Sequence, residues 1–87
     1  PYSHANDIQI AGDIAYVAMD KLLILNVTFP ESPRLIATFN TQSAAQKLVL
    51  LNNTLYVLDQ QGLQILDVSS FENPQLQGQF DSPSSIL

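Results

Sequence analysis

Few side chains in this chain have the chemistry for catalysis or for metal binding. His4 is the only histidine and the chain has no cysteine, so one copy cannot supply a zinc triad. Asp7 is close enough in sequence to form a His–Asp pair with His4, although a histidine in a surface loop is the simpler interpretation. No G-x-S-x-G nucleophile elbow accompanies the serines, so we interpret them as turn residues.

Three aspartates, Asp20, Asp59 and Asp81, are the other candidates for general acid–base chemistry or for calcium binding. Catalytic carboxylates act in close pairs, and calcium takes several oxygen ligands at one site. The chain contains no D-x-D-x-D-G calcium loop. We therefore interpret these carboxylates as solvated residues of turns.

The charge balance excludes whole classes of partner. The formal net charge is −5, and the basic residues Lys21, Arg34 and Lys47 lie far apart. Nucleic-acid binding needs a basic stripe that neutralises phosphates. No apolar run approaches the roughly 20 residues of a membrane helix. The sequence predicts neither nucleic-acid binding nor membrane insertion, and it carries no cofactor motif.

The chain repeats itself with a period of roughly forty residues. The segment LLILNV at 22–27 returns as LQILDV at 63–68. Tyr16-Val17 likewise returns as Tyr56-Val57. Such a unit cannot bury its own apolar faces and must stack on copies of itself. We divide the chain into one unit at 1–41, a second at 42–82 and the opening of a third at 83–87.

Alternating apolar residues predict four short strands in each unit. The expected strands are 7–10, 14–18, 22–27 and 34–39, then 47–51, 54–58, 63–68 and 75–80. Gly12-Asp13 and Asn52-Asn53 are expected to form two-residue hairpin turns, where positive φ is required. Only 43–47 has weak helical character, and it is too short for a stable helix.

Four short antiparallel strands per unit are typical of a β-propeller blade. The alternative all-β fold is a β-sandwich of two four-stranded sheets, but the tandem repeat in register favours the propeller. Propellers close with about four to eight blades, so two blades need others. We expect either the remaining blades of a longer propeller protein or several copies that assemble as a homo-oligomer.

The segment LQILD at 63–67 resembles the signature of the LVIVD repeat. Gly62 before it, the Asn73-Pro74 loop and Phe80-Asp81 at the end of the unit are also similar to that family. The first unit departs from the signature at Asn26 and lacks the preceding glycine. The resemblance implies a propeller blade, an extracellular or cell-surface location in prokaryotes, and no defined general activity.

The signature has a physical interpretation for a blade covered on both sides. Leu63 and Ile65 are expected to face one neighbouring blade, and Leu66 and Val68 the other. Asp67 and its counterpart in the first unit are expected to accept backbone N–H groups of the loop that follows, as Asx residues do.

Propeller geometry places a binding site where the crossovers meet the turns between second and third strands, at the mouth of the channel. The candidate residues there are polar: His4, Asp7, Asp20, Gln42, Gln46, Asp59 and Gln60. A protein or a carbohydrate is the expected ligand. We favour a non-enzymatic interaction module; the alternative is an enzyme or ligand-binding site that several blades build together at the channel mouth.

Overall fold

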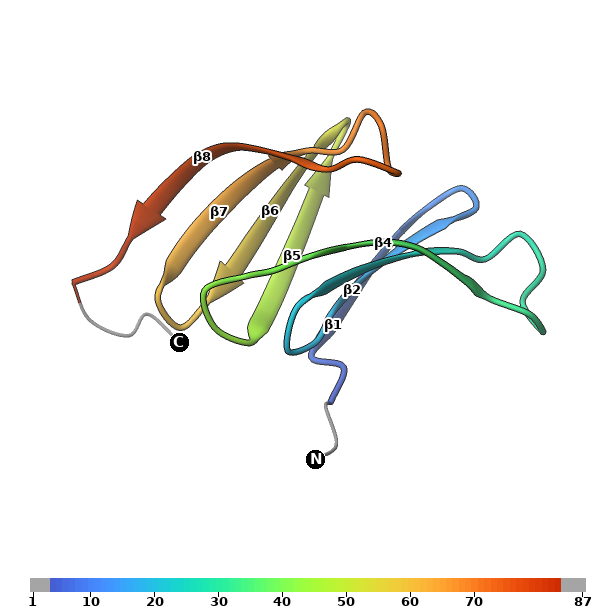
Figure 1. The fold of residues 1–87 in the computed structure, drawn as a ribbon, viewed down its shortest axis with the longest axis horizontal. Coiled ribbons are helices and arrows are strands. Elements are labelled where there is room, and N and C mark those ends of the chain that lie inside the picture. The colour runs from blue at the N-terminus through green and yellow to red at the C-terminus, as the bar shows by residue number, and fades with distance from the viewer. Residues whose placement is uncertain (1–3, 84–87) are drawn as a thin grey trace.

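The computed structural model describes residues 4–83, and these residues form two antiparallel four-stranded sheets. The first sheet contains β1 (Asp7–Ala11), β2 (Ile14–Ala18), β3 (Leu22–Asn26) and β4 (Arg34–Phe39). The second contains β5 (Ala45–Leu51), β6 (Thr54–Asp59), β7 (Gly62–Asp67) and β8 (Gln75–Asp81). Figure 1 shows the two sheets beside each other, each made by one repeat. We call them blade 1 and blade 2.

The all-β prediction is confirmed, and the topology is that of blades. Each strand pairs with its successor, in the orders β1-β2-β3-β4 and β5-β6-β7-β8. A sandwich commonly exchanges strands between its sheets through Greek-key connections, whereas here each repeat completes one open sheet. Residues 4–83 contain no helix, and the weakly helical segment 43–47 instead leads into β5. The expected opening of a third unit falls largely on 84–87, outside the described residues.

The hairpin turns lie where the sequence predicts them. Gly12 has φ of 59° and Asn52 has φ of 55°, the left-handed conformation that a tight hairpin requires and that Gly and Asn adopt most readily. The strand ends differ from expectation by one or two residues. The largest difference is at β5, which begins at Ala45 and contains a bulge between Ala45 and Lys47.

The core lies between the two blades. Because side chains alternate across a strand, one face of each sheet turns toward the other sheet. Buried side chains of blade 1 meet buried side chains of blade 2: Ile14, Tyr16, Leu22 and Ile24 on one side, and Leu48, Leu55, Val57, Leu66 and Val68 on the other. Burying one such aliphatic side chain contributes about 1.5–3 kcal/mol. The interface between blades is therefore the main source of stability in this pair.

The inner strands of the two blades lie side by side. β5 contacts both β1 and β2, and the backbone N–H of Ala45 donates to the carbonyl of Met19 at 2.8 Å. The edge formed by β1 and β5 therefore corresponds to the axis side of a propeller, and β4 and β8 correspond to its rim.

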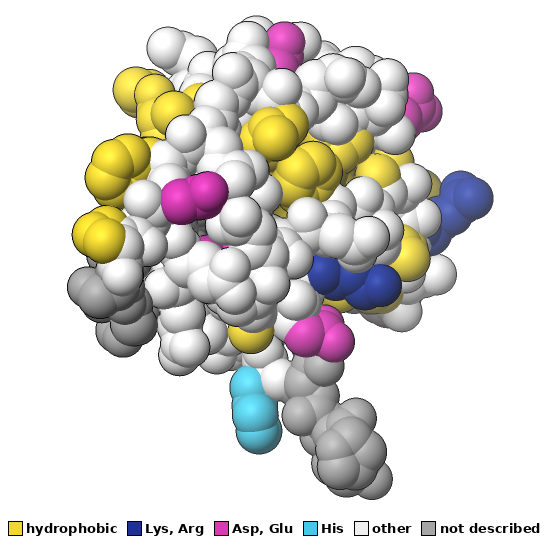
Figure 2. Space-filling model, turned by 60° about the vertical axis from the view of Figure 1, so that its left-hand side comes forward, with side chains coloured by type: hydrophobic (Ala, Val, Ile, Leu, Met, Phe, Trp, Pro, Cys, Tyr) yellow, Lys and Arg dark blue, Asp and Glu magenta, His cyan; other side chains and the backbone are white. Residues whose placement is uncertain are grey.

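Each blade also has an open face, against which no other part of residues 4–83 packs. On blade 1 it contains Ile8, Ile10, Val17, Leu23 and Leu25. On blade 2 it contains Val49, Leu51, Tyr56, Leu63, Ile65 and Phe80. Ile10 and Phe80 expose 61% and 62% of their surface. Figure 2 shows hydrophobic side chains exposed in several patches on the side that Figure 1 has at left.

Candidate functional site

Asp59 is held in a cradle of backbone N–H groups at the end of β6. Its side chain is completely buried, with 0% exposure. Oδ2 accepts the N–H groups of Gln42 at 3.2 Å and Ser43 at 3.3 Å. Oδ1 accepts those of Gln61 at 2.8 Å and Gly62 at 3.0 Å. The expectation that Asp59 is a solvated turn carboxylate is therefore wrong, because two loops close over it.

The same contacts bring three of the candidate residues together. The N–H of Gln60 donates to Ser43 Oγ at 3.1 Å, so the crossover at Gln42 is tied to the turn that follows Asp59. The bonds to Gln42 and Gln60 use their backbone N–H groups. The counterpart of Asp59 in the first unit is Met19, so this carboxylate does not recur from blade to blade. Its visible role is to fix loop geometry.

Asp7 has a related structural role between the blades. Its Oδ1 accepts the N–H of Ile8 at 2.9 Å, and its Oδ2 accepts the N–H of Leu48 in the other blade at 2.8 Å. Beside it, Asn6 donates its side-chain Nδ2–H to the carbonyl of Ala45 at 2.8 Å. These polar bonds join the inner strands in register.

The other candidates do not converge on one site. His4 is exposed, whereas both oxygens of Asp7 bind backbone N–H groups. Asp20 is exposed in the turn between β2 and β3, and Gln46 bonds only locally, to the carbonyl of Ala44 at 3.4 Å. Within residues 4–83, no group of three or more His, Asp or Glu side chains could hold a metal ion.

One buried polar residue escaped sequence reasoning. Gln64 is 4% exposed, and its Oε1 has no hydrogen-bond partner among the described residues. Its Nε2 donates weakly to Gln79 Oε1 at 3.5 Å. The counterpart of Gln64 in the first unit is Leu23. The glutamine at a repeat position where the first unit has a leucine was the signal in the sequence that could have identified this residue.

The Asx prediction is confirmed in both units. Asn26 Oδ1 accepts the N–H of Thr28 at 2.9 Å. Asp67 Oδ1 accepts the hydroxyl of Ser69 at 2.6 Å and its N–H at 2.9 Å. Both bonds favour the charged form, so they lower the pKa of the Asp67 carboxyl below its ordinary value. The bond from the Ser69 hydroxyl has the larger effect on this pKa and the bond from the Ser69 N–H the smaller.

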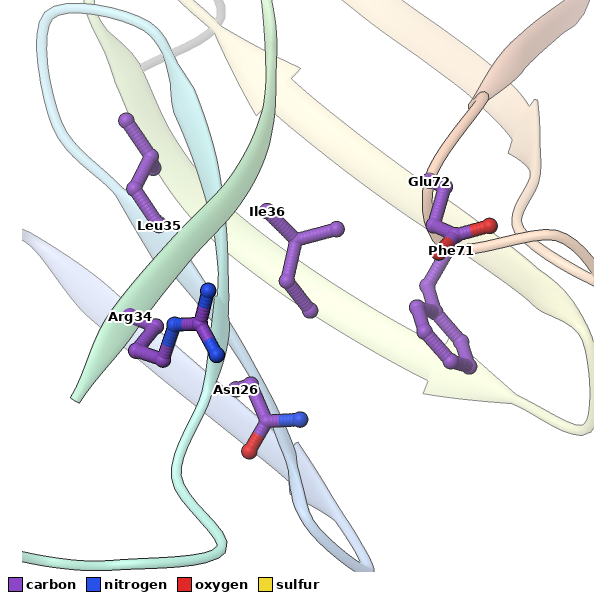
Figure 3. A pocket seen from close by; sticks show the side chains of 6 residues that line it. All are labelled: Asn26, Arg34, Leu35, Ile36, Phe71 and Glu72. Atoms are coloured by element: carbon purple, nitrogen blue, oxygen red, sulfur yellow. The ribbon is translucent and has the colours of Figure 1, made fainter.

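Among the surface grooves that residues 4–83 form, two bear on binding. One, of about 280 Å³, is lined by Asn26, Arg34, Leu35, Ile36, Phe71 and Glu72. In Figure 3, Arg34 and Asn26 come from blade 1, and Phe71 and Glu72 come from the β7–β8 loop across from Ile36. The groove thus sets charges of both signs beside apolar side chains. Sequence reasoning missed it because its walls belong to different units.

The second groove runs along the open face of blade 1 at its inner edge. Its volume is about 400 Å³, and its lining residues are Ala5, Asn6, Asp7, Ile8 and Val17. We call it the β1 groove. One of its lining residues is the same Asp7 whose carboxylate binds the Leu48 N–H of blade 2.

Two stacked sheets, each a meander made by one repeat, define a propeller-type repeat module. Comparison with known families agrees with this class, since the model of the LVIVD repeat matches residues 3–41 and again residues 43–82. The chain belongs to the LVIVD repeat family. Comparisons with curated proteins and with solved structures find no match. No helix among the described residues is long and apolar enough to cross a membrane.

Proposed function

We propose that the chain is a non-enzymatic binding module that supplies two neighbouring blades of a β-propeller, and that further copies of the chain supply the blades that cover its open faces. The proposal rests on one observation: residues on the open face of one blade occupy the same repeat positions as buried residues of the other blade. Tyr56 and Ile65 on the open face of blade 2 are the counterparts of Tyr16 and Ile24. In blade 1 those counterparts are 4% and 0% exposed, because blade 2 covers them.

The correspondence also holds on the other side of the pair. Ile8 on the open face of blade 1 is 51% exposed, whereas its counterpart Leu48 in blade 2 is 3% exposed. Val17 lies on the same open face, and its counterpart Val57 is 1% exposed. Each open face thus has apolar side chains at the same repeat positions as one side of the buried junction. Exposed apolar surfaces of this kind mark interaction sites in soluble proteins.

The closed ring serves as a scaffold that binds a protein or a carbohydrate at its channel end. Two of the carboxylates at that end, Asp59 and Asp7, already accept backbone N–H groups, which supports a structural role for them over catalysis. A general base would need an oxygen free to reach substrate. In keeping with the family resemblance, we place the protein outside the cell or at its surface.

Sedimentation velocity on a variant of the open face tests this proposal. Ile65→Asp puts a charge in the centre of the open face of blade 2, and Asn53→Asp puts the same charge on an exposed turn. We expect the wild type and Asn53→Asp to assemble and Ile65→Asp to remain monomeric with an unchanged β-sheet circular dichroism spectrum. A wild type that stays monomeric at micromolar concentration, or an Ile65→Asp variant that assembles like the wild type, would overturn the proposal.

A further inference from the structure

The junction between the blades shows how one inner strand recognises the next. Blade 1 presents Asn6 and Asp7, which bind the backbone of Ala45 and Leu48 at 2.8 Å each. Ala45 and Leu48 are 0% and 3% exposed there. Together with Val57, at 1% exposure, they form the surface of blade 2 that blade 1 covers.

The β1 groove is the equivalent surface of blade 1, and it is open. Three of its lining residues, Ala5, Ile8 and Val17, are the counterparts of Ala45, Leu48 and Val57 by the repeat. In blade 2 the side chains at these repeat positions are covered by blade 1. In blade 1 the side chains at the same positions border a groove of about 400 Å³. The shape that a preceding blade needs is therefore already present.

The residues that would enter this groove differ in charge from those of the internal junction. Blade 2 has Gln46 and Lys47 at the positions of Asn6 and Asp7. Lys47 is exposed and pairs in register with Leu58, on the open face of blade 2. In the internal junction the residue at this position supplies a carboxylate to Leu48 N–H, and a lysine has no acceptor to offer.

The β1 groove does not need the carboxylate that a lysine lacks. Its equivalent N–H, that of Ile8, is already satisfied by Asp7 Oδ1 at 2.9 Å. A blade that docks here does not need to bring a carboxylate. Asp7, whose Oδ1 holds the Ile8 N–H, is among the residues that line the groove. A lysine at the position of Lys47 is thus complementary to what the groove contains.

We infer that the β1 groove binds the inner edge of blade 2 from a second copy of this chain, with Lys47 of that copy set against Asp7. The inference rests on the proposed function and adds the docking surface and its recognition pair. The contact is head-to-tail, because blade 2 of one copy meets blade 1 of the next. Such contacts close into rings when the rotation between copies permits it. In a chain of net charge −5, a local pair of opposite charges also fixes which edges meet.

Charge variants at position 47 test the pair in the full chain. Lys47→Gln removes the charge, Lys47→Glu reverses it, and Lys21→Glu makes the same reversal in the exposed β2–β3 turn as a matched control. The dissociation constant of the assembly is measured by sedimentation equilibrium at low and at high salt. Relative to wild type, Lys47→Gln should weaken assembly by roughly two- to fivefold, the range for an exposed pair.

Lys47→Glu should weaken it further than Lys21→Glu does, since a carboxylate there faces Asp7. Salt screens the pair, so the difference in affinity between the wild type and Lys47→Gln should shrink at high salt. If the wild type assembles but Lys47→Glu and Lys21→Glu weaken it equally, this inference is overturned while the proposed function stands. A monomeric wild type would overturn both.

Discussion

Asp7 and Leu48 join the inner strands of the two blades, because Asp7 Oδ2 accepts the Leu48 N–H at 2.8 Å. Leu48 is buried, so removing the carboxylate leaves its N–H without a partner. We expect Asp7→Ala to lower the free energy of unfolding by about 1–3 kcal/mol, measured by urea denaturation at fixed protein concentration. Hydrogen exchange of the Leu48 amide should also become faster.

The matched control is Asp13→Ala, which removes an exposed carboxylate from the β1–β2 turn. Exposed substitutions of this kind usually change stability by less than about 0.5 kcal/mol. Unchanged protection of the Leu48 amide in Asp7→Ala would show that the bond contributes nothing to the junction.

We expect Asp59 to contribute more to the free energy of unfolding than any other carboxylate of the chain. It is fully buried, and its two oxygens serve four backbone N–H groups in two loops. Asp59→Ala should cost about 3 kcal/mol or more of unfolding free energy, because several N–H groups lose their acceptor together. Asp20→Ala, in the exposed turn of blade 1, should leave the urea midpoint nearly unchanged. Equal midpoints for the two variants would contradict the cradle.

Gly62 occupies a position that no side chain can share. Its φ is +156°, and an added Cβ would lie 2.0 Å from the carbonyl oxygen of Phe80. Gly62→Ala should therefore displace β8 and cost about 3 kcal/mol or more. At Gly12, where φ is +59° and nothing lies within 4 Å of the added Cβ, alanine should cost only about 1–2 kcal/mol. Thermal unfolding should therefore give Gly62→Ala the lower midpoint, and a midpoint as high as that of Gly12→Ala would contradict the close approach of β8 to this residue.

Asp67 should show a pH effect that its counterpart Asn26 cannot. The Ser69 hydroxyl and N–H lower the pKa of the Asp67 carboxyl. A pKa that is lower in the folded than in the unfolded chain gives stability above the unfolded pKa, and this stability is lost as pH falls through the folded value. Ser69→Ala should raise the Asp67 pKa toward its ordinary value in a carboxyl NMR titration. Ser70→Ala should leave it in place, and a shift of equal size in both variants would refute the assignment.

Local structure could be predicted from the sequence because its causes are local. Alternating apolar residues determine the strands, and the left-handed conformations of Gly12 and Asn52 determine two hairpin turns. The Asx bonds of Asn26 and Asp67 reach only two residues along the chain.

Contacts between distant residues could not be predicted in the same way. The burial of Asp59 depends on N–H groups at Gln42 and Ser43, on the far side of β5 in sequence. The bond between Asp7 and Leu48 needs the two repeats to be stacked in one particular register. Even equivalent residues differ: Tyr16 is buried and Tyr56 is half-buried, because burial depends on a neighbouring blade that the repeat alone does not place.

The mass of the wild-type chain in solution tests the central claim most directly. If further copies cover the open faces, sedimentation equilibrium at micromolar concentration should give a mass of two or more times 9.6 kDa. A ring built only from copies of this chain should contain about two to four of them, matching the usual four to eight blades. A single monodisperse species of 9.6 kDa, unchanged as concentration rises, would contradict the account.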